Sequence, residues 1–139
     1  MKLTPYLMFR DGKCREAFDF YAQTMRGKIL STTTYGDMPP MPGAPPMPDA
    51  MKPLIANVHL LVGNAELMGA DGVENAEGQA TTSVNIEVDS LEEAQRVFAA
   101  MSVDGEIRMP LAETSWSLLF GMFDDRYGQP WMINVMRPS

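Results

Sequence analysis

The same order of predicted elements occurs in both halves of the chain, and this repeat constrains the fold more than any other feature. Each half reads strand, helix, strand, strand, strand, and one constant offset pairs Ala17 with Ala94 and Tyr21 with Phe98 in the two helices. A single βαβββ unit cannot bury both its helix and its sheet, so two units are expected to share a core. The predicted fold class is α+β: two βαβββ units that form a curved mixed sheet, with helices outside and an inner cleft.

The first predicted unit comprises residues 1–72. Strands are expected over residues 3–10, 28–35, 54–62 and 65–70, and a helix is expected over residues 13–25. One apolar stripe marks this helix, formed by Cys14, Ala17, Phe18, Tyr21 and Met25. Gly27 follows where glycine usually ends a helix. Residues 36–53 hold seven of the eleven prolines, so an extended, mobile connection is predicted there.

The second predicted unit comprises residues 80–139, and the two units are expected to make one domain over residues 1–139. Strands are expected over residues 82–88, 106–109, 115–123 and 129–136, with a loop at 110–114. Asp89 or Ser90 is expected to cap a helix over residues 91–101. Residues 124–128 predict a tight turn, because Asp bonds its nearby backbone and Gly128 supplies a positive φ.

Composition and charge exclude several classes of function. A net charge of −7 and a pI near 4.6 argue against partners that present phosphate groups, both nucleic acid and an anionic membrane surface. The sequence contains neither an apolar run long enough to span a bilayer nor a signal-peptide core. Cys14 is the single cysteine and can form no intrachain disulfide, so a cytoplasmic protein is expected. His59 is the single histidine, which excludes any site built from two histidines of one chain.

Several sequence blocks resemble one known group of proteins. The blocks are Tyr6–Phe9, Cys14–Tyr21, Leu67–Asp71, Met109–Trp116 and Phe120–Asn134. They resemble the PhnB-like group of the vicinal-oxygen-chelate superfamily, which includes glyoxalase I, extradiol dioxygenases and bleomycin- or fosfomycin-resistance proteins. The resemblance implies paired βαβββ units and a homodimer. PhnB-like proteins are often labelled as methyltransferases, but the sequence lacks the glycine-rich loop and the alternating long helices of a doubly wound methyltransferase.

Metal-dependent members of this superfamily hold a divalent ion with four His or Glu side chains, two from each half. The resemblance places these positions on Ser83 and Met132, near Tyr6, and near Glu66 or Met68. At least three of the four are therefore not usual ligands of a catalytic divalent ion. The resemblance implies the fold and the cleft without a metal or another cofactor.

Candidate site residues lie on strand faces that are only partly apolar. His59 shares a face with Ile55 and Asn57, and is either a general acid/base or hydrogen-bond donor, or a structural histidine or dimer contact. No carboxylate partner can be assigned to it. Trp131, Ile133 and Val135 suit a core, and the alternate residues suit a cavity wall. The full predicted ligand-binding set is Asn57, His59, Asn85, Glu87, Glu113, Trp116, Met132 and Asn134.

Three functions follow as alternatives. The first is metal-independent binding or sequestration of a small molecule. The second is a lyase, isomerase or dioxygenase with one divalent ion on a rearranged set of His59, Glu66 or Glu87. The third is an interaction subunit whose loop 36–53 binds a partner protein. That loop could also be a lid, a plain excursion, or a Cu(I) site on its methionines. Cys14 is expected to be buried packing.

Overall fold

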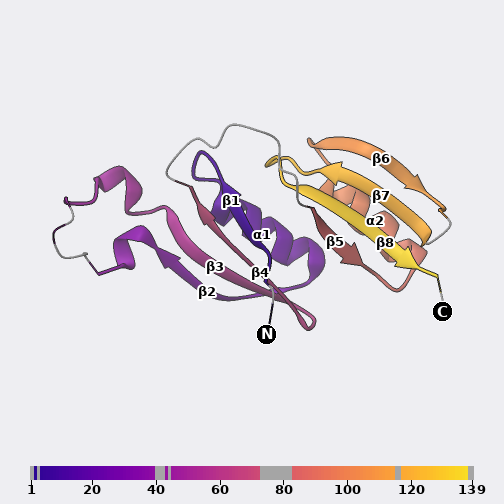
Figure 1. Cartoon of the computed structure of the whole chain (residues 1–139), viewed down its shortest axis with the longest axis horizontal. Coiled ribbons are helices and arrows are strands. Elements are labelled where there is room, and N and C mark those ends of the chain that lie inside the picture. Colours follow the sequence, from indigo (N-terminus) through magenta and orange to yellow (C-terminus); the bar gives the residue numbers. More distant parts are fainter. Residues whose placement is uncertain are drawn as a thin grey trace. The chain divides into compact units, whose positions relative to one another are not determined.

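The computed structural model describes residues 2, 4–39, 43, 45–72, 83–114 and 117–137. It divides into two compact units, Met1–Ala76 and Glu77–Ser139. Each unit is a four-stranded mixed sheet with one helix (Figure 1). The predicted α+β class and the strand-helix-strand-strand-strand order of each half are confirmed. Within the described residues, neither helix has the length and apolar character needed to cross a bilayer.

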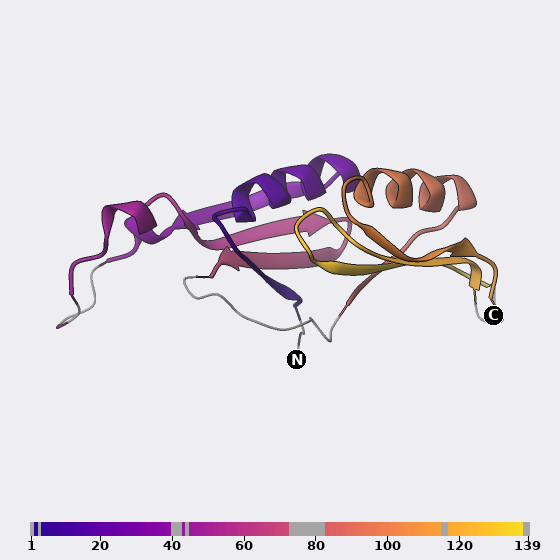
Figure 2. The same ribbon diagram turned by 90° about the horizontal axis from the view of Figure 1, so that it is seen from above.

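The first unit contains strands β1 (Tyr6–Phe9), β2 (Lys28–Thr34), β3 (Ile55–Val62) and β4 (Ala65–Asp71), and helix α1 (Cys14–Met25). The sheet order is β1-β4-β3-β2, in which β1 runs parallel to β4 and the other neighbours are antiparallel. Helix α1 covers one face of this sheet (Figure 2). None of the described residues of this unit forms a helix on the other face, and we call it the helix-free face.

Aromatic side chains fill the space between α1 and its sheet. The ring of Phe18 lies 5.9 Å from that of Phe9 and 5.5 Å from that of Tyr21, both edge to face. Phe18 also explains why residue 69 on β4 is a glycine, because a Cβ there would lie 2.6 Å from the Phe18 ring. The predicted apolar stripe is thus confirmed as core for Cys14, Ala17, Phe18 and Tyr21, whereas Met25 is half-buried and Thr24 is buried in the last turn.

Two details of the first unit correct the sequence-based expectations. Ile55 was predicted to share a face with His59, but it is 1% exposed and belongs to the core. A register shift between β2 and β3 adds a residue next to Ile55 and turns its side chain to the opposite face. At the end of α1 the left-handed residue is Arg26, with φ 55°, rather than Gly27. Residue 27 is a glycine because there is no room for a side chain: a Cβ there would lie 2.8 Å from the carbonyl oxygen of Leu61.

The connection between β2 and β3 is closed at its base. The amide of Tyr35 donates to the carbonyl of Leu54 (2.9 Å), and the amide of Gly36 donates to that of Lys52 (3.0 Å). Short 3₁₀ turns at Tyr35–Asp37 and Asp49–Met51 flank the connection on its two sides. Residues 40–42 and 44 of this segment lie outside the described residues.

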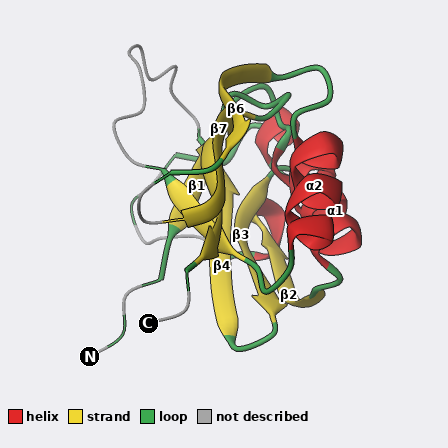
Figure 3. Ribbon diagram, turned by 90° about the vertical axis from the view of Figure 1, so that its right-hand side faces the viewer, coloured by secondary structure: helices red, strands yellow, loops and turns green. Residues whose placement is uncertain are grey.

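The second unit contains strands β5 (Val84–Glu87), β6 (Glu106–Ala112), β7 (Ser117–Asp124) and β8 (Pro130–Met136), and helix α2 (Leu91–Met101). The sheet order is β5-β8-β7-β6, with β5 parallel to β8. Figure 3 shows α2, in red, against one face of the yellow strands. Of the two predicted caps, Ser90 is the one that accepts a hydrogen bond from the amide of Glu93 (3.1 Å).

Strand β6 continues through Pro110 to Ala112, whereas the sequence predicted a loop from residue 110. Proline cannot donate to a sheet ladder, but β6 is an edge strand and its outer amides need no partner strand. The predicted alternation in β8 is confirmed for its core face. Trp131, Ile133 and Val135 are each at most 4% exposed.

Candidate functional site

Four aligned side chains cross the helix-free face of the first sheet, one from each strand. Strand register places Met68 of β4 opposite both Tyr6 of β1 and His59 of β3, and His59 in turn opposite Ser31 of β2. Residues directly opposite each other in neighbouring strands project from the same face. The sheet thereby brings together residues that are far apart in the sequence, with polar groups on both sides of a central methionine.

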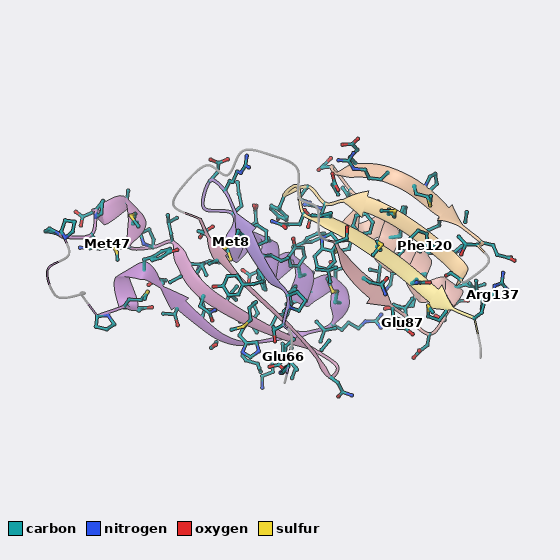
Figure 4. The ribbon with its side chains drawn as sticks, viewed as in Figure 1. Met8, Met47, Glu66, Glu87, Phe120 and Arg137 are labelled. Atoms are coloured by element: carbon teal, nitrogen blue, oxygen red, sulfur yellow. The ribbon has the colours of Figure 1, made fainter. Side chains whose placement is uncertain are left out.

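His59 has a carboxylate partner, which the sequence did not reveal. Its Nε2 lies 2.7 Å from Oε1 of Glu66, and the side chains of the two residues are 24% and 18% exposed. The other carboxylate oxygen of Glu66, on β4 (Figure 4), forms an ion pair with Lys2. The Gly63-Asn64 turn could have revealed this pair: a two-residue hairpin loop sets Leu61 opposite Glu66, and makes Glu66 the diagonal neighbour of His59.

A second polar pair lies on the same face. Asn57 Nδ2 donates to the Tyr6 hydroxyl (3.3 Å), which donates to the carbonyl of Ala56 (3.3 Å). Tyr6 is 46% exposed, and Met8 on the same strand is 53% exposed. The predicted pair Asn57 and His59 therefore lies on one accessible surface, together with Tyr6 and Glu66.

The face of the second sheet opposite α2, its own helix-free face, carries other residue types. Asn85, Met132, Met122 and Met109 stand in one row across β5, β8, β7 and β6. The next row begins with Glu87, Asn134 and Phe120, of which Glu87 and Phe120 are labelled in Figure 4. The predicted residues Asn85, Glu87 and Met132 thus share this face, with methionine as its main component.

Of the remaining predicted residues, two contact neighbouring side chains and the third lies outside the described residues. Asn134 is 7% exposed, and its side chain contacts the buried hydroxyl of Ser117. Glu113 accepts a hydrogen bond from Nη2 of Arg137 (2.5 Å) at the end of β8. Trp116 lies outside the described residues. Asn134 and Glu113 are therefore already engaged by neighbouring side chains within their own unit.

The donor set does not fit the divalent ion that the fold implies. Nowhere in the described ranges do three or more His, Cys, Asp or Glu side chains gather so that they could hold a metal ion. His59 and Glu66 offer two donors, but the carboxylate of Glu66 is shared between His59 and Lys2. Strand register pairs Met132 with Asn85, and neither is a usual ligand of a catalytic divalent ion. A catalytic site normally needs three protein ligands in a fixed geometry.

Cys14 belongs to the core rather than to a site. It is fully buried at the start of α1, and burial, followed by the charge of Asp71, raises the pKa of its thiol to about 12. We expect iodoacetamide to leave the native protein unlabelled at pH 8 and to label it fully in urea, because only the thiolate reacts. Equal labelling rates with and without urea would contradict this assignment.

The same shift predicts how stability depends on pH. The pKa of the folded thiol exceeds its ordinary value of 9.0, so the contribution of the buried neutral thiol is complete below about pH 9. It is lost as the pH rises towards 12.

The chain matches the family described as 3-demethylubiquinone-9 3-methyltransferase over residues 1–134. It is 31% identical to Protein YjdN of Escherichia coli K12, over 99% of this chain and 97% of that protein. The crystal structure of PA1353 from Pseudomonas aeruginosa has a TM-score of 0.87 and 36% identity, and covers 99% of both chains.

Two further structures connect this chain to a wider fold. A Bacillus cereus protein described as a putative 3-demethylubiquinone-9 3-methyltransferase, PhnB, has a TM-score of 0.77 and 27% identity, covering 97% of this chain and 99% of its own. The fosfomycin resistance protein FosX of Listeria monocytogenes has a TM-score of 0.62 at 8% identity, covering 99% and 92%; this likeness concerns the fold. The family description names a methyltransferase, yet the two sheets described above are small mixed βαβββ sheets, so the name does not fit the architecture. The chain belongs to this PhnB-like family and has the fold of the glyoxalase and fosfomycin-resistance proteins.

Proposed function

We propose that the protein binds a small organic molecule on the helix-free face of its first unit, without a metal ion. The observation that carries this proposal is the gathering of four hydrogen-bonding side chains, Tyr6, Asn57, His59 and Glu66, on three adjacent strands. All four are partly accessible to solvent, and such convergent polar groups commonly orient a ligand. A single domain over residues 1–139 that acts as a cytoplasmic homodimer is part of the same proposal.

The geometry indicates which chemical group His59 would recognise. When Glu66 accepts a hydrogen bond from Nε2–H of the neutral imidazole, Nδ1 carries no proton and is a hydrogen-bond acceptor. No hydrogen bond engages Nδ1 within the described part of the chain. A ligand hydroxyl or amine could donate to it, and the Tyr6 hydroxyl and Asn57 amide lie on the same face. The ligand class proposed is a polar small molecule that carries at least one such donor.

The test is a thermal unfolding screen with small hydroxylated and amine-bearing molecules. A ligand at 100 times its Kd adds about 2.7 kcal/mol to the stability of the folded state, which raises Tm by several degrees. We expect His59→Ala to abolish most of this shift and Glu66→Gln to reduce it. Glu16→Ala, on helix α1 where Glu16 pairs with Lys13 at the surface, is the control and should keep the shift. A screen without any stabilising molecule, or a shift that both site variants retain, would contradict the proposal.

A divalent-metal enzyme is the second candidate, and the contact between His59 and Glu66 is the observation that favours it. These are two of the residue types that bind zinc, iron or manganese. The test adds Mn²⁺, Fe²⁺, Ni²⁺ or Zn²⁺ to protein treated with EDTA. Our proposal expects an unchanged Tm. A rise in Tm that disappears in His59→Ala would favour the metal enzyme instead.

A further inference from the structure

Three methionines on the second unit form one continuous cross-strand row. Met122 of β7 lies opposite Met132 of β8 on one side and opposite Met109 of β6 on the other. Directly opposite residues have Cβ atoms about 4.5–5.5 Å apart and project from the same face. Each thioether follows three rotatable bonds, so the two outer sulfur atoms can approach the central one. The row thus places three sulfur donors within reach of one point above β7.

The three methionines of the row do not belong to the core between α2 and its sheet. Trp131 and Ile133, on either side of Met132 in sequence, are buried against the helix side of the sheet, so Met132 projects from the other side. Met109 is 43% exposed, and Met122 and Met132 are half-buried. Within its own unit, the row is therefore partly accessible to solvent and lies outside the core between α2 and the sheet.

The pairing of β6 with β7 is irregular on both sides of Met109. The register between β6 and β7 shifts immediately before Met109 and again after it. Such bulges re-aim individual side chains and are over-represented beside functional sites. Between the two shifts, Met109 is the residue that keeps a partner, and that partner is Met122.

The surroundings of the row favour a soft cation over a hard one. Its fourth member, Asn85 of β5, offers an amide oxygen. The nearest carboxylate along β7 on this face, Asp124, is held by Nε and Nη2 of Arg108 at 3.1 and 2.5 Å. Thioethers are poor ligands for Mg²⁺, Ca²⁺ or Mn²⁺, whereas they select Cu(I). We propose that Met109, Met122 and Met132 form a binding site for a soft monovalent metal ion, Cu(I).

The test uses Ag(I), a soft monovalent cation that does not change oxidation state here. The full chain, labelled with ¹³C at the methionine methyl groups, is titrated with Ag(I) and followed by NMR. We expect three methyl resonances to shift together and to saturate at one Ag(I) per chain. These resonances are assigned by their absence in Met109→Leu, Met122→Leu and Met132→Leu. The readout reports thioethers, so ion capture by the Cys14 thiol cannot be mistaken for this site.

Leucine is a close volume match for methionine, which separates the thioether from simple apolar packing. The triple leucine variant should lose the saturable binding, and Met122→Leu alone should weaken it by at least about tenfold, the smallest usual effect of losing even an outer partner of a metal. Met136→Leu is the matched control, because Met136 is 46% exposed on the same strand β8 but outside the row. Unchanged binding in the triple variant, shifts confined to Met38, Met47 and Met51 of the loop, or no saturation at one equivalent would each overturn the proposal.

Discussion

Replacing Asp125 by alanine is expected to lower the free energy of unfolding by about 4 kcal/mol. Asp125 is 2% exposed. Its Oδ1 accepts hydrogen bonds from the amides of Tyr127 (2.9 Å) and Gln129 (3.0 Å), and its Oδ2 accepts one from Nε1 of Trp131 (2.9 Å). A buried donor that loses its partner costs about 1–3 kcal/mol, and the two amides, which are only part-buried, cost less than the buried indole N–H. The indole contributes most, because Trp131 has no access to water that could replace the carboxylate.

Urea unfolding followed by tryptophan fluorescence measures this change. Asp125→Asn keeps one carbonyl oxygen for the two amides but presents its NH₂ group to the indole N–H, so a loss of about 2 kcal/mol is expected. Asp124→Ala is the adjacent control. It removes an ion pair with Arg108 at the surface, which is worth less than about 1 kcal/mol. An Asp125→Ala variant as stable as Asp124→Ala would show that the turn is not fixed by this carboxylate.

Replacing Asp71 by alanine is expected to lower the free energy of unfolding by about 3 kcal/mol, because it weakens the packing of the first unit. The Asp71 side chain is 1% exposed and joins three elements. It extends from the end of β4 and accepts hydrogen bonds from the amides of Cys14 on α1 (2.9 Å) and Ile55 on β3 (2.8 Å). Alanine leaves both amides buried without a partner. It also removes a negative charge from the N-terminus of α1, where the helix dipole favours one.

Amide hydrogen exchange can locate this loss as well as measure it. Asp71→Ala should accelerate exchange at Cys14 and Ile55, whose amides then lack their acceptor, and lower the urea midpoint. Asp49→Ala is the control, since the Asp49 side chain is 95% exposed and forms an ion pair with Lys52 at the surface. Unchanged protection at Cys14 and Ile55 would mean that the carboxylate does not hold α1 and β3 together.

Local patterns predict those parts of the fold that depend on neighbours in the sequence. The alternation of Trp131, Ile133 and Val135 with more polar residues is sufficient to identify the buried face of β8. The turn before it follows from Asp and Gly chemistry, and the structure places Gly128 at φ 80° as predicted. Both features require information from fewer than about ten adjacent residues.

Features that depend on a partner strand are harder to predict. Ile55 changes face because β2 and β3 slip relative to each other, and the sequence of β3 alone contains no sign of this slip. Pro110 remains within a strand because β6 happens to be an edge. Asp71 sits in a stretch that reads as the start of a polar loop, but its burial depends on amides of α1 and β3.

In the candidate site, too, local features were predictable from the sequence and contacts between strands were not. The sequence predicted that Asn57 and His59 share one face of a strand, since the polar face of a strand is visible by alternation. It did not supply the partner of His59, because that assignment combines a turn type with a strand register. The methionine row is likewise invisible until three separate strands are aligned, since Met109, Met122 and Met132 follow no common spacing within any one element.

The closed base of the connection between β2 and β3 makes this segment a natural position for insertions. Two backbone hydrogen bonds, from Tyr35 and Gly36, already fix where the chain leaves and rejoins the sheet. The length of the segment beyond them is therefore uncoupled from strand register. Doubling the length of a flexible loop costs only about 0.6 kcal/mol, and Gly43 is exposed, with open space of at least 4 Å where a Cβ would lie. A peptide tag or a small domain placed after Gly43 should leave the sheet intact, so the first unit can serve as a scaffold for display.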